Sequence, residues 1–154
     1  MRASIVLCDF AEQDQLGGKV HMLGAGWSVT GPQPSPHAVV VLIKVGWNEA
    51  NESHNFVVRL TDGDGTVVKV PSPAGTQAME FTGDLEVGRP PGTPAGSEID
   101  ATFVINLQPL PLAGGQRYTW RLHLGEQEAA SESFFVRPVP PQVGPPAAPE
   151  PPVS

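Results

Sequence analysis

One run of apolar residues, from Ala38 to Trp47, dominates the hydrophobic pattern of the chain. Lys44 is its only charged residue, and both side-chain parities are apolar from Val39 to Ile43. Because alternate residues of a strand point to opposite faces, this pattern predicts a strand that is covered on both sides. The run is rich in β-branched residues and too short to cross a bilayer, which favours a buried central strand.

Shorter apolar or alternating runs on both sides of this segment predict further strands. The clearest alternation lies in residues 117–124, where the aromatic and leucine side chains share one parity: Tyr118, Trp120, Leu122 and Leu124. No window has an apolar period of 3.6 residues, so helices should be few and short. The other runs are residues 4–9, 19–23, 55–60, 67–70, 79–87, 100–106 and 131–136.

The segments between these runs carry turn signals, and about nine short strands of this kind are typical of an all-β, antiparallel β-sandwich. A β-barrel is the alternative. Residues 11–18 are polar and end in two glycines, which indicates a turn. Residues 48–54 indicate a polar turn or a single helical turn. The β-rich runs 55–60 and 67–70 flank Asp62-Gly63-Asp64-Gly65, which predicts a hairpin.

The composition changes after residue 137. Eight of the seventeen residues in 138–154 are proline and none is aromatic. Proline removes a backbone donor, and the segment has too little apolar surface to bury a core of its own. We therefore predict a folded domain over residues 1–137 and a disordered or polyproline-like tail over residues 138–154.

The net charge of −7 and the pI of about 4.9 narrow the class of partner. Nucleic acids and anionic lipids are bound through clusters of Lys and Arg, which this sequence lacks. Cys8 is the only cysteine, so no intramolecular disulfide can form. The N-terminal residues do not form a signal-peptide pattern, because acidic residues interrupt the apolar run early. The expected location is the cytoplasm.

The acidic loop at Asp62 and Asp64 is the first candidate for chemistry, because alternating Asp residues followed by Gly resemble a calcium loop. The twelfth position of such a loop should be Glu, yet counting from Asp62 it is Pro73. A tight turn therefore explains both acids better. Loops at one end of a sandwich can share an ion, and the further acids available for such a site are Asp9, Asp14 and Asp84.

The other reactive side chains also lack the spacing that catalysis or metal binding requires. No two histidines have the His-x-His or His-x-x-x-His spacing of a zinc site, and no serine has the Gly-x-Ser-x-Gly setting of a hydrolase. Cys8 lies in an apolar strand, which indicates a buried, inert thiol. We expect no catalytic residue, metal or cofactor. The side chains considered are His21, His37, His54, His123, Ser35, Ser53, Ser131 and Ser133.

The tryptophans are better explained by packing than by ligand binding. Trp27 follows Gly24-Ala25-Gly26 and should cover a bend in the chain, Trp120 lies on the apolar parity of its strand, and Trp47 ends the central strand with some exposure. The acids Glu126, Glu128 and Glu132 indicate a solvated hairpin rim. The tail holds two Pro-x-x-Pro motifs, residues 138–141 and 146–149. Such motifs can dock on aromatic grooves, and Arg137 adjoins the first of them.

Four segments together resemble a known family over most of residues 4–137. They are Ile5-Val-Leu-Cys-Asp-Phe-Ala11, Gly18-Lys-Val-His-Met-Leu-Gly-Ala-Gly-Trp27, Leu85-Glu-Val-Gly-Arg-Pro-Pro-Gly92 and Leu112-Ala-Gly-Gly-Gln-Arg-Tyr-Thr-Trp-Arg121. This pattern resembles a family of small bacterial proteins classified as a domain of unknown function, which supplies no catalytic residues to carry over to this chain. The last segment also resembles, more loosely, the late strands of immunoglobulin-like and fibronectin-type modules, which implies an immunoglobulin-like sandwich.

Two classes of function fit these observations. The first is a non-catalytic interaction or structural module that binds another protein through a sheet face, an edge or a loop rim. The second is an enzyme whose site is assembled from separated loop residues. We favour the module, because no set of nucleophile, base and orienting residue is visible. Calcium-dependent binding is a third alternative. The sequence does not define the oligomeric state.

Overall fold

The computed structural model describes residues 1–16 and 18–152 and is all-β in this part of the chain. It contains twelve strands and no α-helix; a single 3-10 helix, η1 (Trp47–Glu49), forms the predicted helical turn. The strands are β1 (Arg2–Cys8), β2 (Phe10–Gln13), β3 (Val20–Leu23), β4 (Val29–Thr30), β5 (His37–Val45), β6 (Ser53–Thr61), β7 (Lys69–Ser72), β8 (Gly75–Ala78), β9 (Glu80–Glu86), β10 (Ile99–Leu107), β11 (Gln116–Leu124) and β12 (Gln127–Val136).

Residues 38–45 of the apolar run lie in β5, the middle strand of a three-stranded sheet in the order β1-β5-β10. The strand ends at Val45, and Trp47, which the sequence pattern predicts to end it, begins η1 instead. Both neighbours of β5 are antiparallel to it. Val39, Val41 and Ile43 point into the main core, whereas Val40 lies in a smaller cluster on the other face. The prediction of a central strand covered on both faces is therefore confirmed.

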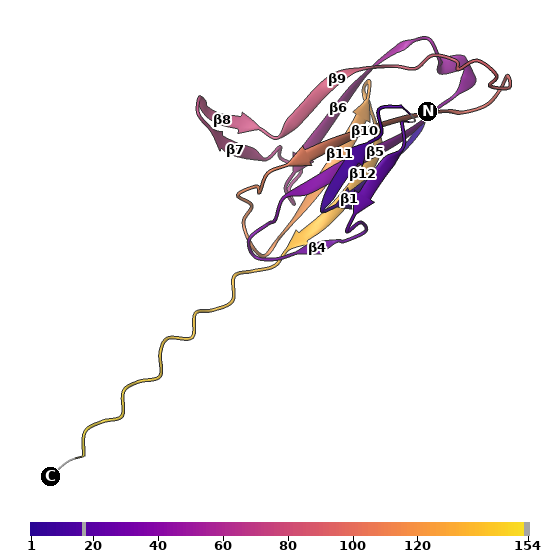
Figure 1. Cartoon of the computed structure of the whole chain (residues 1–154). Helices are drawn as coiled ribbons and strands as arrows, with labels where there is room; N and C mark the ends of the chain where they lie inside the picture. Colours follow the sequence, from indigo (N-terminus) through magenta and orange to yellow (C-terminus); the bar gives the residue numbers. More distant parts are fainter. Residues whose placement is uncertain (17, 153–154) are drawn as a thin grey trace.

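The second sheet has five strands in the order β4-β12-β11-β6-β9 (Figure 1). Its second and third strands form a hairpin, and the alternation of β11 places Tyr118, Trp120 and Leu122 in the core, as predicted. Leu124 packs against the edge of the same core. Side chains from both sheets form this one core, an arrangement consistent with a β-sandwich.

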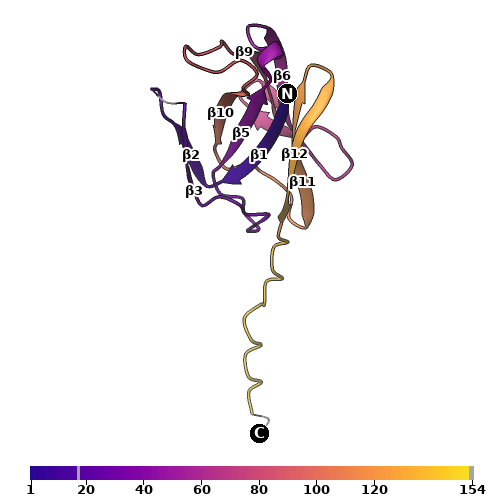
Figure 2. The same ribbon diagram turned by 90° about the vertical axis from the view of Figure 1, so that its right-hand side faces the viewer.

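A two-stranded ribbon, β2–β3, lies on the outer side of the three-stranded sheet (Figure 2). Ala11 is buried against Val40 beneath the ribbon, and the Asn106 side chain of β10 exchanges two hydrogen bonds with the Ala11 backbone, of 3.2 and 2.8 Å. The prediction of a turn over residues 11–18 is thus wrong for residues 11–13, which belong to β2 and pair with β3. Gly17, from the predicted glycine turn, lies outside the described residues.

Strand pairing after β6 also differs from the prediction. The Asp62–Gly65 turn is present, with the Asp62 N–H donating to Thr66 O at 2.9 Å, but the expected hairpin is limited to a single bridge between Thr61 and Val67. β6 instead pairs along its length with β11 and β9. Because these two strands occupy both edges of β6, the chain after Val67 leaves the sheet and forms the separate ribbon β7–β8.

Three short strands account for the difference between the nine expected and the twelve observed: β2, β4 and β8. One of them also departs from the antiparallel prediction, because β4 is parallel to the end of β12. Its register pairs Val29 with Phe135 and Thr30 with Val136. This two-residue pairing fixes the segment after Trp27 beside the last strand, where it forms the wall of the cavity described below.

Residues 138–152 contain no strand or helix and are exposed, and they run away from the end of β12 (Figure 1). The first tail residues touch the domain, because a Cβ at Gly114 would lie 2.8 Å from Arg137 O and 3.1 Å from Pro138 Cα. Val153 and Ser154 lie outside the described residues.

We predict that cutting the chain after Arg137 leaves the melting temperature unchanged. The tail buries almost no apolar surface, so it cannot offset the entropy of ordering its backbone. Differential scanning calorimetry of residues 1–137 and of the full chain measures this directly. A fall of several degrees would place the domain boundary further along the chain.

Candidate functional site

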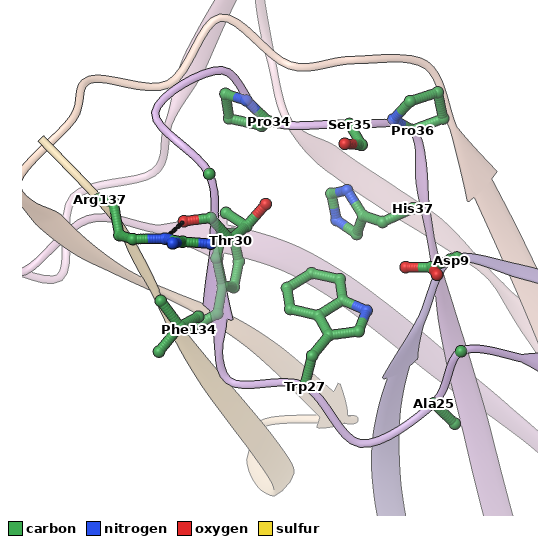
Figure 3. Close-up of a pocket in the computed structure, with 13 residues that line it drawn as sticks. Asp9, Ala25, Trp27, Thr30, Pro34, Ser35, Pro36, His37, Phe134 and Arg137 are labelled. Atoms are coloured by element: carbon green, nitrogen blue, oxygen red, sulfur yellow. Dashed lines mark hydrogen bonds between the residues drawn. The ribbon is translucent and has the colours of Figure 1, made fainter. Parts of the chain in front are cut away.

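A cavity of about 430 Å³ opens between the end of β1, the segment from Gly24 to His37 and the end of β12 (Figure 3). It lies where the glycine-rich bend after β3 meets the proline-rich connection that leads to β5. The thirteen residues that line it are Asp9, Gly24, Ala25, Trp27, Val29, Thr30, Gly31, Pro34, Ser35, Pro36, His37, Phe134 and Arg137. The cavity is large enough for one or two side chains of a partner or for a small ligand.

The floor of the cavity is aromatic. The Trp27 ring meets His37 and Phe134 edge to face, with centroids 5.6 and 5.7 Å apart and interplanar angles of 80° in both pairs. His37 and Phe134 are themselves 5.9 Å apart. Such contacts fix the orientation of each ring beyond what apolar burial provides. The Trp27 Nε1 atom is buried with no hydrogen-bond partner among the described residues.

His37 belongs to the core more than to the cavity, since it is only 3% exposed. Trp120 donates its indole N–H to His37 Nε2 at 3.3 Å, so in the neutral ring this nitrogen is the acceptor and Nδ1 carries the proton. Burial lowers the pKa of His37, and a hydrogen bond with the Ser35 backbone opposes this effect only in part. With one nitrogen engaged by Trp120 and the other by Ser35, the ring has no free base to offer a substrate.

Two charged side chains flank the aromatic floor. The Asp9 carboxylate points into the cavity from one side, and Arg137 lies at the opposite side, where its Nε donates to Thr30 O at 3.2 Å (Figure 3). No cation among the described residues forms an ion pair with Asp9. Gly24 has a φ of +63°, and a Cβ there would overlap the Asp9 carboxylate, so glycine is needed for both the turn and the space.

Exposed apolar side chains gather next to this cavity. Phe10 and Leu23 are paired across the β2–β3 ribbon, and they are 49% and 67% exposed. They directly adjoin Asp9 and Gly24 of the cavity wall. The other large exposed apolar residues of this stretch are Leu16, Met22 and Val29, whereas elsewhere among the described residues only Met1, Val139 and Val143 are comparable. We call the surface formed by Phe10, Leu23, Val29 and the cavity the ribbon face.

The structure does not bring the remaining reactive residues together. Cys8 is buried, as predicted, and burial, with a smaller contribution from Asp9, raises its thiol pKa, which keeps it protonated. Ser35 lines the cavity, and Ser133 pairs with Thr119 at 2.8 Å. The described residues contain no group of three His, Cys, Asp or Glu side chains that could hold a metal ion. In the same part of the chain, no helix is long and apolar enough to span a membrane.

The acidic turn at Asp62 uses its carboxylate internally. Asp62 Oδ1 accepts the backbone N–H groups of Asp64 at 2.9 Å and of Thr66 at 3.0 Å. This oxygen therefore stabilises the turn, as Asp commonly does at such positions.

We predict that calcium leaves the melting temperature unchanged, because an ion bound only by the folded state would have to raise it by mass action. A thermal scan with and without millimolar calcium tests this. The double variant Asp62→Asn, Asp64→Asn serves as the control. Calcium stabilisation of the parent alone would contradict the prediction.

Trp120 is a core residue, as predicted, and Trp27 covers the bend after the glycines. Trp47 is half-buried, with the Arg89 guanidinium 4.7 Å from its ring centroid. Of the predicted acidic rim, Glu126 and Glu128 are exposed, and Glu128 pairs with Arg121 at 3.1 Å.

The sequence pattern did not predict Phe10 or Arg137 as site residues, nor the cavity between them. The one sequence feature that pointed to this region was the glycine-rich bend before Trp27, which indicated a close approach of the backbone.

No curated protein matches the chain. The family of unknown function DUF6941 matches residues 3–137, which include both sheets, the β2–β3 ribbon and the cavity. The match stops where the proline-rich tail begins. This chain therefore belongs to that family of unknown function.

Proposed function

We propose that this protein is a non-catalytic interaction module that binds another protein through the ribbon face. The observation that carries this proposal is the exposure of Phe10, Leu23 and Val29 beside the cavity, at 49%, 67% and 49%. Contiguous apolar surface beside a cavity is unfavourable in water and is typical of interaction sites. Phe10 and Leu23 are large enough to form the centre of such an interface, with Asp9 and Glu12 at its polar rim.

The chemistry of the cavity favours binding over catalysis. His37 has no free nitrogen, the Cys8 thiol is buried and protonated, and Ser35 has no histidine available as a base. An acyl-transfer or hydrolytic site would need a nucleophile within hydrogen-bond reach of a base. The fixed aromatic floor is instead suited to receiving a side chain without chemical change.

An immunoglobulin-like arrangement is part of this proposal. It is supported by the strand orders β1-β5-β10 and β4-β12-β11-β6-β9, which parallel the two sheets of such domains. It is also supported by Tyr118, near the start of β11. Its hydroxyl accepts the Ala113 N–H at 3.0 Å and donates to Ala113 O at 3.4 Å, as a tyrosine corner does. Modules of this kind commonly present edges and loops to protein partners.

The test is affinity purification with the full chain as bait, followed by measurement of the dissociation constant for each recovered protein. The double variant Phe10→Ser, Leu23→Ser should weaken binding by about tenfold or more, as expected when central apolar contacts are lost. Leu16→Ser is the matched control, since Leu16 is 99% exposed on the same ribbon but at the opposite end from the cavity. It should bind like the parent.

Equal binding by the double variant and the parent would show that another surface is used. Turnover in a broad substrate screen, lost in Asp9→Asn with the fold intact, would favour the enzyme alternative over the module. Circular dichroism of each variant checks that the β-sheet signal of the parent is retained. The exposure of Phe10 and Leu23 makes their replacement by serine compatible with folding.

A further inference from the structure

We propose that the cavity of the ribbon face receives an Arg or Lys side chain of the protein partner, with Asp9 as its counter-charge and Trp27 as its aromatic contact. This inference rests on the proposed function and defines the chemistry of the partner. A cation held between a carboxylate and an indole ring gains from both the charge pair and the ring quadrupole. Asp9 and Trp27 lie in one cavity and supply these two groups.

Asp9 is available for this role. Its carboxylate is free of ion pairs with the described residues and points into the cavity (Figure 3). Its position is fixed from two directions. The Asp9 N–H donates to Leu23 O at 2.9 Å, and Gly24 leaves room for the carboxylate that any side chain there would fill. A carboxylate placed in this way needs little reorganisation when a cation enters.

The surrounding charges also favour a cation on this side of the cavity. His37 beneath the floor stays neutral at physiological pH, because burial lowers its pKa, so it does not repel the incoming charge. Arg137 is the only cation that lines the cavity, and its guanidinium is held at the far side by Thr30 O. The chain as a whole has a charge of −7, and such a field raises the rate of encounter with basic segments.

The position of Asp9 next to Phe10 adds a constraint on the sequence of the partner. The cavity and the exposed Phe10–Leu23 pair are adjacent along both strands of the ribbon, since Asp9 precedes Phe10 and Gly24 follows Leu23. A partner segment that lies across this end of the ribbon can contact both, with a large apolar side chain on the pair and a basic side chain in the cavity. The recognised segment should therefore combine one apolar and one basic residue.

The experiment uses the full chain as bait for a displayed library of random seven-residue peptides, and the enriched peptides are then synthesised for titration calorimetry. We expect Arg or Lys together with a large apolar residue in the enriched set. Asp9→Asn should weaken binding by about three- to fivefold, as for a partly exposed charge pair. Asp14→Asn, at the other end of the ribbon, should bind like the parent. Raising the salt concentration should weaken the parent and leave Asp9→Asn almost unaffected.

Two outcomes would overturn this inference and leave the proposed function standing. One is enrichment of apolar or proline-rich peptides without a basic residue, with binding that still depends on Phe10 and Leu23. The other is equal affinity for the parent and for Asp9→Asn. Loss of dependence on Phe10 and Leu23 as well would overturn both proposals, because the ribbon face would then play no part in binding.

Discussion

Replacing Trp120 with alanine is expected to lower the free energy of unfolding by roughly 3–5 kcal/mol, a large share of the stability of a domain of this size. Trp120 is 0% exposed and lies in the middle of β11, between both sheets. Its removal creates a cavity in the main core and leaves His37 Nε2 without its donor. Chemical denaturation followed by circular dichroism measures the change.

Trp47→Ala is the matched control, because it removes the same side chain from a half-buried site on η1. Its contact with Arg89 is a cation–π pair at the surface, so the expected loss is only about 1 kcal/mol. Similar losses in the free energy of unfolding for the two variants, or an unchanged transition for Trp120→Ala, would contradict this prediction. The packing of Trp120 in the core would then not be a major source of stability.

The second large effect is a loss of stability, dependent on His37, as the pH falls below the ordinary histidine pKa of about 6.5. The folded state lowers the pKa of this histidine by burial, so the unfolded chain binds the proton more readily. The stability that neutral His37 contributes is fully present above about pH 6.5 and falls as the pH drops. The expected slope is about 1.4 kcal/mol per pH unit until the pH reaches the folded pKa.

The variant His37→Gln should abolish most of this slope, since glutamine can still accept the Trp120 N–H but does not titrate. His21→Gln, on the exposed surface of β3, should keep it. Glu49 and Glu98 also have lowered pKa values, from a hydrogen bond with the N-terminal ammonium group and with Arg2, but they begin to protonate only near and below their ordinary pKa of 4.5. A slope of equal size in the parent and in His37→Gln would assign the acid sensitivity to other groups.

Local pattern was enough to predict the strands that are longest and most strictly patterned. The burial of Val39 to Ile43 on both faces follows from their apolar parities alone, and so does the inward orientation of Tyr118, Trp120 and Leu122 on β11. On β11 a slip of one residue would expose every one of these side chains, so burial of the apolar parity fixes the register. On β5 both faces are covered, so the apolar run predicts the buried strand but not its register. The all-β class followed from the same signals.

The partners of each strand, and with them the candidate site, were decided only by tertiary structure. Residues 11–13 belong to a segment that reads as a polar turn, yet they form a strand because they pair with β3. Asn106, ninety-five residues beyond Ala11, then bonds to the Ala11 backbone and attaches this strand to the sheet. The hairpin expected after Asp62 is limited to one bridge because β9 and β11 occupy the edges of β6. A strand edge has one set of hydrogen-bonding groups, and which segment occupies it depends on a competition across the whole chain that no local pattern records. The cavity at Asp9, Trp27 and His37 results from that competition, since its walls come from the bend after β1 and from β4, β5 and β12.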